Sequence, residues 1–460
     1  MEKFKSFITE AKEDKYRILV ISAEHGEKAI TAKRMEEEAE NLKYPIYVAP
    51  MDGTYTKFEN NIRTVHKIDD DKGFEIHIED TVIFIRGTPE RDSWLDFISQ
   101  LEKSGYCVVN SRDCMELAAD KYRTYLRLQD FGLTQPNTVL IPNKDSAEKS
   151  FENLGTKFPI ILKTLRGSKG VGVLFIESER SLNSIVQLLF KQDSQSDLLI
   201  QEYIKTDFDI RALVLGGKII ATMQRDVLEG DFRSNFSQGA KVKKYDLTDL
   251  EIEQCLLAAK AVGGLFTAVD FIPSENPKKD PPYILEVNSS PGTEGIEEAN
   301  NKNIVKEIIT YFNDPELRYT VPIECGFLEV LNVKPFGPII SKFDSGNSSL
   351  PVIHGDDIEL KGKMVHWKLF GKDMKNRLIK TKKVNLGGMR DYSEERYTIA
   401  LDIEFAGTIY KNVEFTIDDR KNRTRILLNR DIMRQMNVMV NPQRKYIITT
   451  KYVLDNSYEE

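Results

Sequence analysis

The sequence predicts an α/β region over residues 15–312, followed by an all-β domain over residues 326–455. In the first hundred residues, short runs of β-branched residues alternate with amphipathic stretches, an order typical of a parallel sheet with crossover helices. After Cys325, apolar residues recur at every second position, as they do in half-buried strands. A chain of 460 residues also exceeds the usual size of one hydrophobic core, so several folding units are expected.

A first α/β domain is predicted over residues 15–115. Apolar runs rich in Val, Ile and Tyr indicate its strands, and apolar residues at helical spacing among Lys and Glu indicate its helices. The predicted strands are 17–21, 45–49 and 81–87, and the predicted helices are 30–42 and 94–103.

Strands, helices and glycine-rich turns continue over residues 116–312, which we treat as a second domain. Its proline-rich stretch 274–282 cannot be regular structure and is predicted to be an exposed loop that joins two strands. Asn313-Asp314-Pro315 should stop a helix, so residues 313–325 are the predicted linker.

A phosphate-binding site is indicated at the end of the apolar strand 158–163. This strand places Lys163 directly before the glycine-rich stretch 164–173. Flexible glycines let backbone N–H groups approach phosphate oxygens, and the lysine adds a point charge. The stretch lacks the Gly-Lys-Ser/Thr ending of a Walker A loop, and a plain glycine-rich hairpin is the alternative.

A metal site is predicted where two further strands carry acidic and amide groups. Glu286 and Asn288 lie two positions apart, so in a strand they share one face. The proline-rich loop would bring the strand of Asp270 beside them. Two carboxylates and an amide oxygen suit Mg²⁺. The alternative is a set of polar residues on an edge strand.

These elements, in this order, resemble a RimK-type ATP-grasp ligase over residues 16–312. The resemblance implies an ATP-grasp fold, in which a pre-ATP-grasp α/β domain precedes two α+β lobes. The most specific motifs are Gln201-Glu202-Tyr203-Ile204-Lys205, Asp209-Ile210-Arg211, Gly230-Asp231-Phe232-Arg233-Ser234-Asn235 and Glu286-Val287-Asn288-Ser289-Ser290-Pro291-Gly292.

The resemblance also implies roles for single residues. Residues expected at the nucleotide are Lys121 and Lys163 on the phosphates, Glu202 and Tyr203 at the adenine hinge, Asp209 near the ribose, and Arg233, Ser234 and Asn235. Asp270, Glu286 and Asn288 would hold two Mg²⁺ ions, with Mn²⁺ as a substitute. Arg211 and Arg225 are expected to neutralise a substrate carboxylate or acyl phosphate, and an ordinary salt bridge is the alternative for each.

The implied reaction phosphorylates a carboxylate with ATP, and an amine then attacks the acyl phosphate to form an amide. The RimK-type resemblance favours addition of an amino acid, glutamate first, to the carboxyl end of a peptide or protein. A small-molecule ligase of the glutathione or lysine-biosynthesis kind is the alternative, and a non-catalytic peptide-binding module is a third. The acidic chain end 455–460 raises the further hypothesis of self-modification.

The all-β domain resembles a retropepsin-like protease. Alternating apolar residues at 397–405 and 413–417 flank a turn at 406–408. Lys342-Phe343-Asp344-Ser345-Gly346-Asn347 resembles the Asp-Thr/Ser-Gly turn, and Ile426-Leu427-Leu428-Asn429-Arg430-Asp431 resembles the segment that packs near it. Together these motifs look most like the RimB-like family, labelled ATP-dependent zinc proteases. Asn429 replaces the usual glycine, a change expected to be mild because Asn tolerates left-handed backbone better than most residues.

One such turn supplies one aspartate, whereas aspartic protease chemistry needs two. A working site would therefore need a homo-oligomer that brings two copies of Asp344 together. The domain has only His354 and His366 and no cysteine after Cys325, so the zinc label gains little support. The alternatives are an inactive peptide-binding domain and a metal site.

Composition narrows the function classes further. A net charge of −7 argues against nucleic acid or an anionic membrane as the main partner. No stretch approaches the roughly 18 apolar residues of a membrane span, and charges stand where a signal peptide would be apolar. Four cysteines without a Cys-x-x-Cys pair are expected to be reduced and buried. We expect a cytoplasmic protein.

Overall fold

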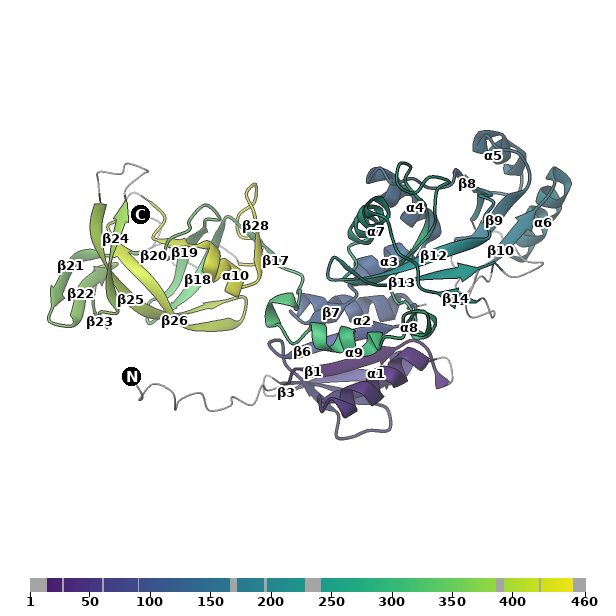
Figure 1. Cartoon of the computed structure of the whole chain (residues 1–460). Helices are drawn as coiled ribbons and strands as arrows, with labels where there is room; N and C mark the ends of the chain where they lie inside the picture. The colour runs from purple at the N-terminus through teal and green to yellow at the C-terminus, as the bar shows by residue number, and fades with distance from the viewer. Residues whose placement is uncertain are drawn as a thin grey trace. The chain divides into compact units, whose positions relative to one another are not determined.

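A computed structural model describes residues 15–26, 29–59, 62–89, 91–165, 172–193, 197–227, 241–385, 393–421 and 423–449. The chain divides into two compact units, Met1–Thr320 and Val321–Glu460 (Figure 1). The division falls inside the predicted linker, and the finer domain boundaries stay a prediction. No helix in the described ranges is long and apolar enough to cross a membrane. All four cysteines are buried free thiols, as expected.

The first unit begins with a parallel four-stranded sheet in the order β2-β1-β6-β7. Along β1, Ile18 and Val20 enter one hydrophobic cluster and Leu19 and Ile21 enter another, so both faces of the sheet are covered. The strands are β1 Arg17–Ser22, β2 Ile46–Pro50, β6 Thr81–Arg86 and β7 Cys107–Val109, with helices α1 Ile30–Asn41 and α2 Asp92–Lys103. The predicted elements of this domain are confirmed to within about two residues.

The chain forms a three-stranded antiparallel sheet after β2 and before β6, and this sheet was not predicted. Its strands are β3 Thr54–Glu59, β4 Ile62–Lys67 and β5 Phe74–Ile76. Most positions of β3 are exposed, among them the aromatic residues Tyr55 and Phe58, and none is fully buried, so the alternation of apolar and polar residues that reveals a strand is weak there. Val65 of β4 and Ile76 of β5 supply its buried apolar contacts.

Two antiparallel sheets follow in the same unit. The four-stranded sheet has the order β10-β9-β11-β8 and packs against α5 and α6. The five-stranded sheet has the order β14-β13-β12-β15-β16 and packs against α7. The strands of the four-stranded sheet are β8 Thr138–Ile141, β9 Ile160–Thr164, β10 Val173–Ile176 and β11 Leu198–Glu202. The helices that pack against it are α5 Ala147–Leu154 and α6 Glu179–Gln192. The strands of the five-stranded sheet are β12 Phe208–Leu215, β13 Lys218–Asp226, β14 Val242–Lys243, β15 Phe266–Ile272 and β16 Tyr283–Asn288. The helix that packs against it is α7 Asp249–Ala261.

Four further helices connect these sheets and return the chain to the parallel sheet: α3 Arg112–Ala119, α4 Lys121–Asp130, α8 Glu294–Asn300 and α9 Ile304–Tyr311. Helix α9 packs on α1 and shares a cluster with Tyr16. Arg318, inside the predicted linker, donates to the carbonyl oxygens of Phe312 and Glu79. The first part of that linker is therefore bonded to the first unit.

The second unit is rich in strands, as predicted, and its retropepsin-like identity stays a prediction. The seven-stranded sheet has the order β18-β19-β27-β20-β26-β25-β24, and pairing of β18 with β25 closes it on itself. Inward residues of β25, from Ile399 to Phe405, are buried at alternate positions, which confirms the predicted alternation. The elements are β17 Ile323–Gly326, β18 Leu328–Lys334, β19 Gly337–Phe343, β20 Val352–His354, β21 Asp356–Lys361, β22 Met364–Leu369, β23 Lys372–Arg377, β24 Lys380–Asn385, β25 Ser393–Phe405, β26 Thr408–Asp418, β27 Ile426–Leu428, α10 Arg430–Gln435 and β28 Val438–Asn441.

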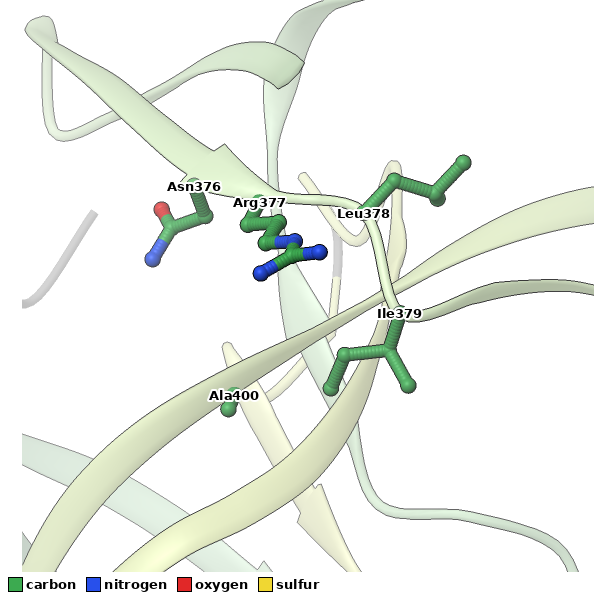
Figure 2. Close-up of a pocket in the computed structure, with 5 residues that line it drawn as sticks. All are labelled: Asn376, Arg377, Leu378, Ile379 and Ala400. Carbon is green, nitrogen blue, oxygen red and sulfur yellow. The ribbon is translucent and has the colours of Figure 1, made fainter. Parts of the chain in front are cut away.

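A pocket of about 450 Å³ lies where β23 leads into β24. Figure 2 shows its lining residues, Asn376, Arg377, Leu378, Ile379 and Ala400. Arg377 is the one charged group among them. The pocket therefore offers a single cation and an apolar wall.

Glu329 is expected to be a main determinant of the stability of the second unit. Its carboxylate is fully buried and accepts hydrogen bonds from the backbone N–H groups of Gly326, Ile447, Ile448 and Thr449 at 2.7–3.2 Å. Glu329→Ala leaves these donors without a partner and should lower the free energy of unfolding by about 3 kcal/mol or more.

The buried Trp367 lies in this unit, so its fluorescence in a Trp94→Phe background follows unfolding of the second unit alone. Glu324→Gln, which removes a charge from the neighbouring strand β17, is the matched control and should change little. Equal stability of the Glu329→Ala variant and its parent would contradict this account.

Candidate active site

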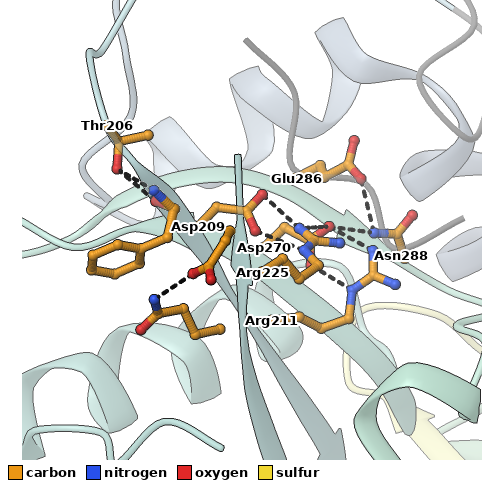
Figure 3. A network of polar contacts seen from close by, with 10 residues as sticks. Thr206, Asp209, Arg211, Arg225, Asp270, Glu286 and Asn288 are labelled. Atoms are coloured by element: carbon orange, nitrogen blue, oxygen red, sulfur yellow. Dashed lines mark hydrogen bonds and ion pairs between the residues drawn. The ribbon is translucent and has the colours of Figure 1, made fainter. Parts of the chain in front are cut away.

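The three predicted metal ligands lie together on the five-stranded sheet (Figure 3). Strands β15 and β16 pair antiparallel with Asp270 opposite Glu286, which the predicted loop makes possible by joining them. Asn288 Nδ2 lies 3.0 Å from Glu286 Oε1 and 3.4 Å from Asp270 Oδ2. Two carboxylates and an amide within hydrogen-bond reach are a hard-oxygen donor set, so these residues fit Mg²⁺, with the amide oxygen as the Asn288 ligand.

Two arginines lie against Asp270 and offset its negative charge. Arg211 Nε and Nη2 donate to both oxygens of Asp270 at 2.7 and 2.6 Å. Arg225 makes the same two-pronged contact with Asp209 at 2.7 Å, and its Nη2 also lies 3.1 Å from Asp270. Burial opposes ionisation of Asp270, but the guanidinium groups of Arg211 and Arg225 outweigh it and hold its pKa well below the usual range.

The side chains of the two arginines differ in their exposure to solvent. The Arg225 side chain is 4% exposed, and burial lowers its pKa less than Asp270 and Asp209 raise it, so it stays charged between them. The Arg211 side chain is 18% exposed, and its Nη2 lies 2.6 Å from Asp270 Oδ2, closer than the Nη2 of Arg225. The contacts of Arg225 are those of a buried salt bridge. Asp209, expected near the ribose, is bonded to Arg225 in this arrangement, and its predicted role stays untested.

Lys163 and Lys121 come together at the end of β9. The Lys121 backbone N–H donates to the carbonyl oxygen of Leu165 at 3.1 Å, which fixes the start of α4 beside β9. Lys163 Nζ donates to Gln201 Oε1 at 2.6 Å. Burial lowers the pKa of Lys163 to about 8. The nearby Glu286 carboxylate has the opposite, smaller effect on this pKa. The two lysines place positive charge beside Glu286, which is compatible with the predicted contacts to phosphate oxygens.

Glu202 and Tyr203 lie where the chain passes between the two antiparallel sheets. Glu202 ends β11 of one sheet, and β12 of the other begins at Phe208. The Tyr203 ring packs edge-on against Phe175, with centroids 5.1 Å apart. This position is compatible with the predicted adenine hinge. Arg233, Ser234 and Asn235 lie outside the described residues, as do most of the glycine-rich stretch and the acidic chain end.

Asn110 is a site residue that sequence reasoning missed. Its buried side chain bonds the N–H groups of Leu265 and Phe266 and the carbonyl oxygens of Phe266 and Ser289, at 2.5–2.9 Å. These bonds tie the start of β15 to the residue after Asn288, so Asn110 links the strands that carry Asp270 and Glu286. A single Asn after an apolar strand carries no sequence signal of that role.

In the second unit, Asp344 follows β19 on the predicted turn. Its carboxylate accepts a hydrogen bond from the Gly346 N–H at 3.0 Å, lies 3.7 Å from Lys342 Nζ, and is 32% exposed. Asn429 has φ −111° and ψ 171°, so the expectation of left-handed backbone there is wrong. Asn429 is used as a helix cap instead: its side chain bonds the Ile432 N–H and the Ser349 carbonyl oxygen, tying α10 to the turn.

His354, Asp356 and Asp419 also cluster in this unit, close enough to share a cation. The Arg420 backbone N–H donates to His354 Nδ1 at 2.9 Å, so the neutral ring carries its proton on Nε2, 3.3 Å from Asp356. Burial, followed by the positive charge of Arg425, lowers the pKa of His354 and favours this neutral form. With Nδ1 accepting and Nε2 protonated, the imidazole has no lone pair left for a metal.

Comparison with known proteins finds relatives of the first unit. The model of the RimK-like ATP-grasp domain matches residues 118–312. "Probable alpha-L-glutamate ligase" of Psychromonas ingrahamii is 31% identical over 297 residues, which cover 64% of this chain and 94% of that protein. "Probable alpha-L-glutamate ligase 2" of Pseudoalteromonas atlantica is 30% identical over 283 residues, covering 61% and 90%. The structure of ATP-grasp ligase PsnB complexed with minimal precursor has a TM-score of 0.50 at 16% identity, over 66% of this chain and 100% of that one, a likeness of fold.

Proposed function

The chain belongs to the RimK-like ATP-grasp family and is an ATP-dependent carboxylate-amine ligase that uses Mg²⁺, and from this premise we propose that it adds glutamate to the carboxyl end of a peptide or protein. The observation that carries the proposal is the cluster of Asp270, Glu286 and Asn288 beside Lys163. Glutamate is favoured because the relatives that match over most of their length are named alpha-L-glutamate ligases. The peptide acceptor follows from the RimK-type motifs of the sequence.

Each group has a task in this chemistry. MgATP, when bound, supplies the phosphoryl group that activates the acceptor carboxylate. Lys121 and Lys163 would bind its phosphates, and Asp270, Glu286 and Asn288 would hold two ions. Arg211, partly exposed beside the metal cluster, would face the negative charge of the activated carboxylate.

ADP release with Mg²⁺ tests the proposal when single amino acids are screened against peptides with acidic carboxyl ends. Release should require both a free peptide carboxylate and glutamate, and a peptide with an amidated carboxyl end is the control that should fail. ADP release with free small molecules alone would favour a small-molecule ligase of the glutathione or lysine-biosynthesis kind. No ADP release with any acceptor would contradict a ligase.

The pH dependence of nucleotide binding should reveal Lys163. Its pKa is lowered to about 8 in the free protein, and bound phosphates favour the ammonium form and raise that pKa. Affinity for an ATP analogue should therefore be constant below about pH 8 and fall as the pH rises above it. Lys163→Arg keeps its charge and should remove the decline, which calorimetric titration can check. A parallel decline in both proteins would contradict this role of Lys163.

We further propose that the second unit is an aspartic-type peptidase that trims the product and acts as a homo-oligomer. The half-exposed Asp344, bonded to Gly346 N–H at the end of β19, supports this. One carboxylate per chain cannot share a proton with a second, so two copies are needed. Asp344→Asn should retain ligation and lose peptide cleavage. Cleavage by Asp344→Asn would contradict the proposal and leave a peptide-binding domain.

A further inference from the structure

A second pocket of the C-terminal unit lies beside the turn that carries Asp344. It has a volume of about 380 Å³, within the range of about 300–1,000 Å³ typical of ligand pockets. Its walls come from the turn, helix α10 and strand β28. The lining residues are Ser345, Arg430, Met433, Arg434, Asn437, Val438 and Val440.

The pocket is cationic although the chain as a whole is acidic. Arg430 and Arg434 lie one helical turn apart on α10, so their side chains share a face. Both are exposed, and no acidic residue lines the pocket. Met433 lines the same space with apolar surface. Two guanidinium groups over an apolar wall suit a carboxylate on a short aliphatic stem.

The strand register places the carboxylate of Glu324 on the side of β28 that faces away from this pocket. Val438 and Val440 line it, so Met439 and Asn441 point to the other face of β28. Glu324 is opposite Met439 and accepts a hydrogen bond from Asn441 Nδ2 at 2.7 Å, on that other face. Within the described part of the chain, Arg430 and Arg434 have no carboxylate at ion-pair distance.

We propose that this pocket binds a glutamate side chain of an acidic peptide and so holds that peptide beside Asp344. The inference rests on the proposed function, since it makes the glutamate-tailed product of ligation the ligand of the second unit. An arginine presents a planar fork that binds a carboxylate through two parallel hydrogen bonds, so two arginines select an acidic peptide over a neutral one. Asp344 lies one residue from Ser345 of the pocket wall, which places the peptide next to the predicted cleavage site.

Fluorescence anisotropy of a labelled tetraglutamate peptide tests the proposal on the full chain. An Asp344→Asn background prevents cleavage, and EDTA without ATP prevents ligation. Tetraglutamate should bind more tightly than tetraglutamine. Arg430→Gln/Arg434→Gln should weaken tetraglutamate binding by about tenfold or more, an effect that added salt reduces.

Lys375→Gln/Arg377→Gln is the matched control, because it removes two exposed charges from β23, of which Arg377 lines the other pocket (Figure 2). It should bind tetraglutamate as the parent does. ADP release by the parent protein with ATP and Mg²⁺, measured separately, reports on the first unit, so a failed ligase and a failed pocket are distinguishable. Equal binding of tetraglutamine, or unchanged binding in the Arg430→Gln/Arg434→Gln variant, would overturn the proposal.

Discussion

Glu286→Gln is expected to lower ATP-dependent ligation by about a thousandfold or more while the protein stays folded. The change keeps the size of the side chain and removes one charged oxygen donor from the proposed metal site, where several kcal/mol of charge stabilisation are supplied. Glu286 is half-buried and accepts a hydrogen bond from Asn288, and the nearby buried Lys163 keeps its hydrogen bond to Gln201, so the fold should be retained. ADP release at saturating ATP measures the loss.

The matched control is Glu275→Gln, which removes an exposed carboxylate from the loop that joins the same two strands. It should retain ligation. Full activity of the Glu286→Gln variant at ordinary Mg²⁺ concentrations would remove Glu286 from the metal site.

Asp270→Asn is expected to cost both activity and stability. Arg211 loses the carboxylate that takes both of its donated hydrogen bonds, and the buried Arg225 keeps Asp209 alone. Breaking a buried pair by removing one partner typically costs about 3–5 kcal/mol, and the lower end applies because Arg225 retains a partner. Hydrogen exchange of β12, β13 and β15 should show the loss in the first unit.

A double variant separates the two effects of Asp270. Asp270→Asn/Arg211→Met removes the unpaired cation together with its partner, so it should recover part of the lost stability and none of the activity. Wild-type exchange rates in the single variant Asp270→Asn would show that the ion pairs do not stabilise this sheet.

Local patterns predicted that Asp270, Glu286 and Asn288 lie together, because their geometry is local. Glu286 and Asn288 share a face through strand periodicity, and the loop 274–282 makes the strand of Asp270 their neighbour. The pairing of Arg225 with Asp209 and Asp270 depends on strand order across the sheet, which periodicity does not reveal. Sequence therefore indicated charged residues here without showing which of them are bonded to each other.

Residues that act through backbone contacts were missed for a related reason. Asn110 follows the apolar strand β7 and Glu329 lies within β18, and apart from Gly326 the partners of both lie more than a hundred residues away in sequence. Asn429 shows the converse error: residue type suggested left-handed backbone, whereas the side chain caps α10 in extended backbone. Long-range hydrogen bonds decide such roles, and the sequence carries no periodic sign of them.

The most direct test of the ligase proposal is mass spectrometry of a peptide with an acidic carboxyl end after incubation with ATP, Mg²⁺ and glutamate. The Asp344→Asn variant should build a ladder of products separated by one glutamate residue, the wild type a shorter ladder, and the Glu286→Gln variant none. An unchanged peptide with Asp344→Asn, in a preparation that releases ADP with another acceptor, would contradict glutamate addition to a peptide end.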